Sequence, residues 1–188
     1  MVGSIHERSA SAFGKEPLLL VLSGLPGSGK SALARRLAPR LGAAWLRIDT
    51  IEQSLRDLCG VKVEGYELAY RLAADQLRAG TSVVADSVNP IGLTRRAWHA
   101  VAESQGRKVV DVEICCSDEV EHRRRVEGRV AEVAGLRQPT WAEVRARDYE
   151  PWTDPVIRVD TASAALDESL AQLLAALKRL PQHWSDDP

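Results

Sequence analysis

The chain has 188 residues, enough for one domain with a buried core and too few for two comfortable ones. With 45% hydrophobic residues, 27% charged residues and a net charge of −1, its composition is that of an ordinary globular protein and does not indicate a polyanionic partner. No stretch approaches the roughly 20 apolar residues of a membrane-spanning helix, and no apolar signal sequence precedes the first predicted strand. We therefore expect neither membrane insertion nor secretion.

The three cysteines, Cys59, Cys115 and Cys116, lack the spacing of a metal site. Neighbours such as Cys115 and Cys116 rarely form a disulfide because the geometry is strained. Free thiols in a reducing cytoplasm are therefore expected. The histidines share no ligand spacing with these cysteines or with each other, so no structural zinc is predicted, and His122 is interpreted as a surface residue.

Apolar runs alternate with segments of helical spacing along residues 17–180, which we interpret as one folded domain between two flexible tails, 1–16 and 181–188. The predicted strands are residues 18–23, 43–48, 81–86, 108–116 and 156–160. The predicted helices are residues 30–41, 50–59, 66–79, 92–105, 118–127, 141–150 and 163–179. Thr140 and Glu143 have the spacing of a capping box before the sixth helix. This alternation is typical of an α/β protein with a parallel sheet between two layers of helices.

The first predicted strand leads into GLPGSGKS, which matches the G-x-x-x-x-G-K-[ST] pattern of a phosphate-binding loop. Backbone N–H groups of such a loop surround the α- and β-phosphates of ATP, and the following helix directs its positive end at them. Lys30 is expected to contact the β- and γ-phosphates, and the Ser31 hydroxyl to bind Mg²⁺. The alternative is a glycine-rich turn that fits the pattern by coincidence. The residues expected to bind ATP are Gly24, Leu25, Pro26, Gly27, Ser28, Gly29, Lys30, Ser31 and Ala32.

Two aspartates end predicted strands, Asp49 after the second and Asp86 after the third. Both are site candidates, because open α/β sheets bind ligands at the carboxyl ends of their strands. Asp49 can accept the proton of an acceptor hydroxyl that attacks the γ-phosphate, or it can cap the following helix. Asp86 can hold Mg²⁺ through water, or it can cap the turn before Asn89 and Pro90. We expect Asp49, Asp86 and Asn89 to face the substrate.

Residues 128–139, GRVAEVAGLRQP, fit neither the helical nor the strand period and are predicted to form a mobile lid. Arg125 and Arg129 are four residues apart and share one helical face if the preceding helix continues that far. Their guanidinium groups are expected to neutralise charge on the transferred phosphoryl group. The alternative is a solvated basic face paired with Glu121 and Glu127.

The order of these parts resembles the small P-loop kinases that phosphorylate hydroxyl groups. Over most of residues 18–130 the chain is similar to the kinase domain of polynucleotide 5′-hydroxyl kinases, through GLPGSGKS, RIDTIEQS (47–54), ADSVNPIGLTRRAWHAVAESQGRKV (85–109) and HRRRVEGR (122–129). DTIE also resembles the same region of chloramphenicol phosphotransferases, in which an Asp deprotonates a drug hydroxyl. The resemblance implies a three-layer P-loop NTPase fold like that of nucleoside monophosphate kinases, with a five-stranded parallel sheet and an arginine-bearing lid. It also implies Asp49 as general base, Asp86 as a carboxylate near the metal and Arg129 as the lid arginine on the phosphates.

One position departs from the polynucleotide kinases. They are expected to have an arginine three residues after the base, which grips the substrate's neighbouring phosphate, whereas this chain has Glu52. Glu52 lies on the same helical face as Asp49 and would repel that phosphate. We therefore predict a substrate that is neutral or carries an amine, such as a sugar or an aminocyclitol drug. This inference weakens if Glu52 pairs with Arg56, its i+4 neighbour.

Together these features predict a phosphotransferase that moves the γ-phosphoryl group of Mg-ATP to a hydroxyl of a small molecule, with Asp49 as the base. Lys30, Arg125 and Arg129 would stabilise the developing charge. A polynucleotide 5′-hydroxyl kinase is an alternative, which requires a local basic channel. A nucleotide-binding regulatory ATPase is another, and its function would not depend on Asp49.

Overall fold

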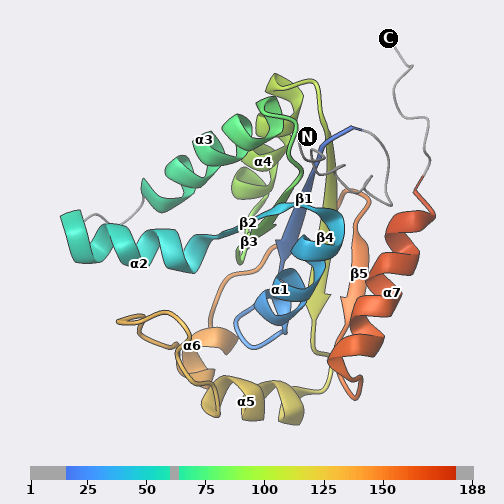
Figure 1. Cartoon of the computed structure of the whole chain (residues 1–188). Helices are drawn as coiled ribbons and strands as arrows, with labels where there is room; N and C mark the ends of the chain where they lie inside the picture. The colour runs from blue at the N-terminus through green and yellow to red at the C-terminus, as the bar shows by residue number, and fades with distance from the viewer. Residues whose placement is uncertain (1–15, 60–63, 181–188) are drawn as a thin grey trace, which may run out of the picture.

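The computed structural model describes residues 16–59 and 64–180, which form a five-stranded parallel sheet with helices on both faces (Figure 1). The strands are β1 (Leu18–Ser23), β2 (Ala44–Arg47), β3 (Val83–Asp86), β4 (Lys108–Cys115) and β5 (Ile157–Asp160). Their order across the sheet is β2-β3-β1-β4-β5, and neighbouring strands are parallel. The predicted three-layer α/β fold is confirmed. The predicted tails, apart from Glu16, lie outside the described residues.

All seven predicted helices are present, mostly within two residues of their predicted ends. They are α1 (Lys30–Leu41), α2 (Ile48–Cys59), α3 (Glu64–Arg78), α4 (Gly92–Ser104), α5 (Glu119–Glu127), α6 (Trp141–Arg145) and α7 (Leu166–Lys178). The predicted capping box of Thr140 and Glu143 begins α6. Residues 129–140 contain no helix or strand, as predicted for the lid.

Two of the helix boundaries that differ from the prediction bear on the site. The sixth helix was predicted to reach residue 150 but ends at Arg145, and the chain beyond it is held by Arg95, which binds the carbonyl oxygens of Glu150 and Pro151 at 2.6 and 3.2 Å. The second helix begins at Ile48, so Asp49 lies in its first turn and not at the end of β2.

The core has two halves because alternate residues of a strand point to opposite faces of the sheet. Leu20 and Leu22 of β1 face α1 and α7, whereas Leu19 and Val21 face α3 and α4. All four are fully buried, which is typical of the central strand of a sheet covered on both sides. None of the helices in residues 16–59 and 64–180 is long and apolar enough to cross a membrane.

The elements expected to carry chemistry gather beyond the carboxyl ends of the strands. Figure 1 shows α5, α6 and the lid lying below the strand tips, with the lid extending beneath α2. Contact between the lid and α2 is close, since a Cβ atom on Gly135 would stand 3.0 Å from Nε2 of Gln53. The phosphate-loop pattern connects β1 to α1 at the same edge. The fold thus brings these segments to one end of the sheet.

Candidate functional site

The phosphate-loop pattern adopts a backbone that requires glycine at two positions. Gly24 has a φ of 144°, and a Cβ atom there would stand 2.1 Å from the carbonyl oxygen of Ile114. Gly27 has a φ of 83°, and its Cβ would stand 2.6 Å from a methyl group of Val126. Only glycine adopts these angles without strain and also tolerates such close neighbours. The sequence pattern therefore has a structural counterpart at this turn.

His122 supports the same loop from α5. Its Nε2 atom lies 2.8 Å from the carbonyl oxygen of Pro26, and its ring packs edge-on against Trp141. Only 7% of His122 is exposed, so its interpretation as a surface residue is wrong. The helical pattern of α5 was too polar to reveal this buried side.

Lys30 begins α1 and is enclosed by the loop. Its Nζ atom donates a hydrogen bond to the carbonyl oxygen of Leu25 at 3.2 Å. Burial lowers the pKa of Lys30, and the nearby carboxylates of Asp86 and Asp49 partly offset this effect. A buried ammonium in this position would be stabilised by the negative charge of a bound phosphate.

Asp86 ends β3 as predicted and is buried. It accepts hydrogen bonds from the Ser31 side chain and, at 3.3 Å, from Nε1 of Trp45. Burial raises the pKa of Asp86, while Lys30 and Ser31 act in the opposite direction. The hydroxyl and carboxylate are the oxygen donors that Mg²⁺ prefers, so this pair fits the predicted metal site. The described residues contain no group of three or more His, Cys, Asp and Glu side chains that could hold a metal ion by itself. In P-loop kinases the phosphates of ATP also bind the metal.

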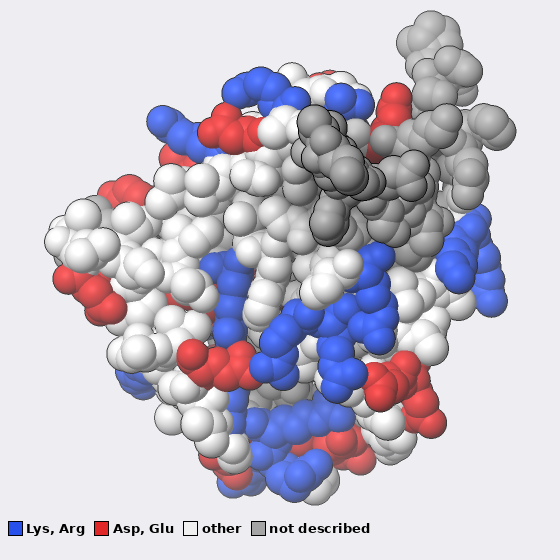
Figure 2. Space-filling view, in the orientation of Figure 1, with Lys and Arg blue, Asp and Glu red and all other residues white. Residues whose placement is uncertain are grey.

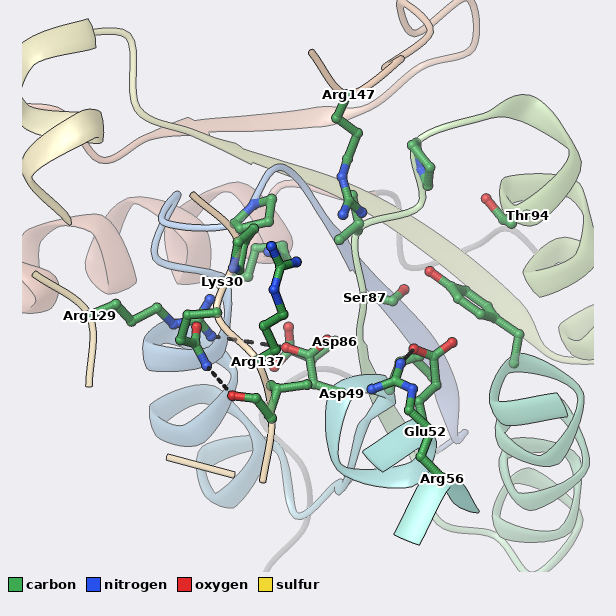
Figure 3. A pocket seen from close by; sticks show the side chains of 18 of the residues that line it. Lys30, Asp49, Glu52, Arg56, Asp86, Ser87, Thr94, Arg129, Arg137 and Arg147 are labelled. Atoms are coloured by element: carbon green, nitrogen blue, oxygen red, sulfur yellow. Dashed lines mark hydrogen bonds and ion pairs between the residues drawn. The ribbon is translucent and has the colours of Figure 1, made fainter. Parts of the chain in front are cut away.

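A cavity of about 480 Å³, here called the larger cavity, opens beside Lys30 (Figure 3). Asp49 lines it from the first turn of α2, and Nη2 of Arg129 lies 4.0 Å from Oδ2 of Asp49. The volume is that of a typical small-molecule site. The charged residues that line it are Lys30, Asp49, Glu52, Arg56, Asp86, Arg129, Arg137 and Arg147.

A second cavity of about 190 Å³, here called the smaller cavity, lies over the phosphate loop. It is lined by Gly27, Gly29, Lys30, Ser31, Ala32, Arg125, Arg129, Val130 and Glu132. Lys30 and Arg129 line both cavities, so the two meet at these cations. Phosphoryl transfer needs such a junction, with the nucleotide on one side and the acceptor on the other.

Arg125 lines the smaller cavity but is held by protein groups. It donates to the hydroxyl and carbonyl oxygens of Thr161 at 2.7 and 2.8 Å, and to Oε1 of Glu121 at 2.6 Å. The Thr161 hydroxyl in turn donates to the carbonyl oxygen of Ser28 at 2.9 Å. Arg125 therefore has features of both predictions: it pairs with Glu121, and it also lines the smaller cavity beside the phosphate loop. Because α5 ends at Glu127, Arg125 and Arg129 do not share a helix.

Glu52 lines the larger cavity, but its charge is already paired. Nη2 of Arg56 donates to Oε2 of Glu52 at 2.9 Å. Gly65 of α3 packs against the same side chain, since a Cβ there would stand 2.2 Å from Cγ of Glu52. The condition that weakens the prediction of a neutral or amine substrate is therefore met. Glu52 alone does not determine the charge of the acceptor.

Asn89 does not reach the larger cavity, contrary to its predicted contact with substrate. Its side chain is fully buried, donating to Oγ of Ser23 at 3.0 Å and accepting from Nε1 of Trp98 at 3.1 Å. Both ends of the amide are thus engaged inside the fold. Its role in this structure is to join the turn after β3 to α4.

Several residues of the larger cavity were not predicted from the sequence, among them Tyr66, Ser87, Arg137 and Arg147. Burial raises the pKa of Tyr66 to about 12, so its phenol stays protonated. The two arginines come from the lid and from the segment after α6. No spacing pattern singles them out, because irregular segments bring them to the site.

A family model described as an AAA domain matches residues 19–151, which is most of the chain. Two curated relatives match this chain over about nine tenths of their own length. The adenylyl-sulfate kinase of Chloroflexus aurantiacus is 27% identical over 176 residues, 87% of this chain and 90% of that protein. The probable adenylyl-sulfate kinase of Aeropyrum pernix is 24% identical over 178 residues, 86% of this chain and 92% of that protein.

Solved structures share the fold at low sequence identity. A gluconokinase from Sinorhizobium meliloti has a TM-score of 0.64 and 18% identity, covering 89% of this chain and 95% of that one. The APS kinase of Mycobacterium tuberculosis, solved with AMPPNP and APS, has a TM-score of 0.62 and 19% identity, covering 88% of this chain and 99% of that one. The implied P-loop kinase fold is therefore confirmed. The resemblance to polynucleotide kinases and chloramphenicol phosphotransferases in particular stays a prediction.

Proposed function

The chain belongs to the AAA domain family and is an ATP-dependent kinase for a hydroxyl group of a small molecule, and we propose that Asp49 is its general base. The acceptor would be sugar-sized, with sugars, aminocyclitols and antibiotic-like alcohols as candidates. The observation that supports this proposal is the junction of the two cavities at Lys30 and Arg129, with Asp49 4.0 Å from Arg129.

In the proposed reaction, the acceptor oxygen forms a bond to the γ-phosphorus of ATP and the bond from that phosphorus to the β–γ bridging oxygen breaks, which releases ADP. Asp49 takes the proton of the hydroxyl as the oxygen attacks. Lys30 and Arg129 are positioned to stabilise the negative charge that develops on the transferred group. Mg²⁺, held by Ser31 and Asp86, would neutralise phosphate charge.

The test is phosphoryl transfer from labelled ATP to a panel of sugars, nucleosides, aminoglycosides and short 5′-hydroxyl oligonucleotides. Asp49→Asn should lower kcat by about 100-fold or more, because general base catalysis contributes that much, while ATP binding stays near the wild-type level. Transfer to no member of the panel would refute the proposed function. Undiminished transfer by Asp49→Asn would refute the role of Asp49 alone.

The two alternatives predicted from the sequence give different outcomes in this assay. A polynucleotide kinase would phosphorylate the oligonucleotides with strong salt dependence. Figure 2 shows a group of basic side chains over α1 with acidic side chains at its edges, and Arg36 pairs with Asp167 and Arg35 with Glu132, so acidic residues limit the extent of this basic group. A regulatory ATPase would bind nucleotide tightly and phosphorylate nothing in the panel.

A further inference from the structure

The charges that line the larger cavity do not balance. Five cationic and three acidic side chains surround it. Each carboxylate has a cation beside it. Asp49 lies near Arg129, and Glu52 is bonded to Arg56. Asp86 is buried beside Lys30. The excess positive charge therefore comes from the remaining two cations, Arg137 and Arg147.

These two arginines differ in how far protein groups already satisfy them. Nη2 of Arg137 donates to Oε1 of Glu143 at 2.7 Å, outside the larger cavity. Within residues 16–59 and 64–180, by contrast, no carboxylate lies within ion-pair distance of Arg147. Arg147 is thus the cation of this cavity that is most available to a ligand.

Arg147 also occupies the right place to meet an acceptor. Figure 3 shows its side chain extending into the cavity from the side opposite Glu52 and Arg56. Its charge acts on both walls. Burial lowers the pKa of Lys30 on the phosphate loop, and Arg147 adds to that effect. Burial raises the pKa of Glu52 on α2, and Arg147 opposes that effect. A molecule that presents its hydroxyl to Asp49 in this cavity would therefore interact electrostatically with the guanidinium group of Arg147.

The backbone that carries Arg147 is fixed on both sides. Before it, α6 begins with the capping box of Thr140 and Glu143. After it, the backbone N–H of Glu150 donates to the carbonyl oxygen of Pro90 at 2.8 Å, and Arg95 binds the carbonyls of Glu150 and Pro151. A guanidinium presented from an ordered backbone loses less entropy when it binds a ligand.

We propose that the acceptor carries an anionic group, a carboxylate, sulfate or phosphate, in addition to the hydroxyl that is phosphorylated, and that Arg147, flanked by Arg137, binds this group. The proposal rests on the proposed kinase function and narrows its substrate class. A guanidinium matches these planar or tetrahedral oxyanions with paired, charge-assisted hydrogen bonds. Arg147 would repel an acceptor with an ammonium group near it. The acceptor charge inferred from the structure is therefore opposite to the neutral or amine-bearing acceptor predicted from Glu52.

The test compares acceptors that differ mainly in charge, at saturating Mg-ATP so that the phosphate loop is occupied. The panel consists of glucose, glucosamine, gluconate, glucose 6-sulfate and glucose 6-phosphate, together with equivalent charge-matched sets built on other polyols and nucleosides. For the set that is phosphorylated, kcat/KM should be about 10- to 100-fold higher for the anionic member than for the neutral one. The amine member should be the poorest.

Arg147→Met should remove this preference by raising the KM for the anionic acceptor, with the KM for ATP unchanged. Arg147→Lys should keep part of it, because the charge remains but the paired hydrogen bonds do not. Arg145→Met is the matched control: it removes the same charge from α6, where Arg145 pairs with Glu119 outside the larger cavity, and should leave the preference intact. Inorganic sulfate should inhibit competitively with the acceptor in the wild type and only weakly in Arg147→Met.

The outcomes separate this inference from the function on which it rests. Equal or better transfer to neutral or amine acceptors would overturn the anionic class while leaving the kinase intact. The same would follow if Arg147→Met lowered kcat/KM equally for all charges. Transfer to no member of any set would refute the kinase proposal and this inference with it.

Discussion

His122 donates a hydrogen bond from Nε2 to the carbonyl oxygen of Pro26, across 2.8 Å and from a different segment of the chain. A carbonyl oxygen only accepts, so the proton must be on Nε2. The bond fixes the middle of the phosphate loop to α5, and the ring also packs edge-on against Trp141. The loop conformation thus depends on α5 as well as on its own glycines.

His122→Ala should therefore weaken nucleotide binding by about fivefold, because a net contribution of about 1 kcal/mol is typical of one such hydrogen bond. The measurement is the Kd for Mg-AMPPNP by calorimetry. His99→Ala is the control, since His99 of α4 pairs with Asp111 of β4 and does not line either cavity. An unchanged Kd for His122→Ala would show that the loop keeps its shape without this bond.

Local sequence predicted the parts of the site that contiguous patterns encode. Lys30 and Ser31 belong to one motif, and Asp86 follows from the rule that parallel sheets bind ligands at the ends of their strands. Arg147 could not be found in this way, because it lies in an irregular segment that is held by Arg95, which is 52 residues earlier in the chain (147 − 95). Asn89 shows the opposite error: a polar residue after a strand looked like a substrate contact but satisfies buried groups of the fold. Burial and pairing of single side chains are tertiary properties.

Gly65 provides a test of how α3 positions the Glu52–Arg56 pair. Gly65→Ala would place a Cβ 2.2 Å from Cγ of Glu52, and the resulting overpacking should lower the free energy of unfolding by about 1–3 kcal/mol despite the better helix propensity of alanine. In a Glu52→Ala background the Cγ is gone, so the same change should cost much less. Urea denaturation of the wild type, the two single variants and the double variant measures this coupling. Additive effects would mean that the two helices separate without strain.

Glu52 also predicts a dependence of stability on pH. Burial raises the pKa of Glu52 above its ordinary value of 4.5, so the native protein binds this proton more readily than the unfolded chain does. Stability contributed by this group is therefore greatest below about pH 4.5 and falls as the pH rises through the native pKa. The free energy of unfolding of Glu52→Gln, relative to the wild type, should increase with pH over this window. A relative stability that falls with pH in urea titrations would contradict the prediction.

Among the described residues, Arg95 is a buried cation that lines neither the larger nor the smaller cavity, and we expect it to stabilise the fold. Its guanidinium binds backbone carbonyls on both sides of the site, those of Asn89 and Pro90 after β3 and those of Glu150 and Pro151 after α6, and it stacks on Trp152 at 4.0 Å.

Arg95→Met should therefore lower the free energy of unfolding by about 1–3 kcal/mol, because it removes the donor to the buried carbonyl of Asn89 and the donors to the partly buried carbonyls of Glu150 and Pro151. Arg96→Met, on the exposed side of the same helix, should change it by less than about 0.5 kcal/mol.

Arg95→Lys separates charge from geometry: lysine retains the charge but cannot span four carbonyls, so we expect a folded protein with a raised KM for the acceptor and an unchanged KM for ATP. Thermal denaturation and steady-state kinetics measure these effects. Wild-type kinetics in Arg95→Lys would mean that the segment carrying Arg147 is held by other contacts.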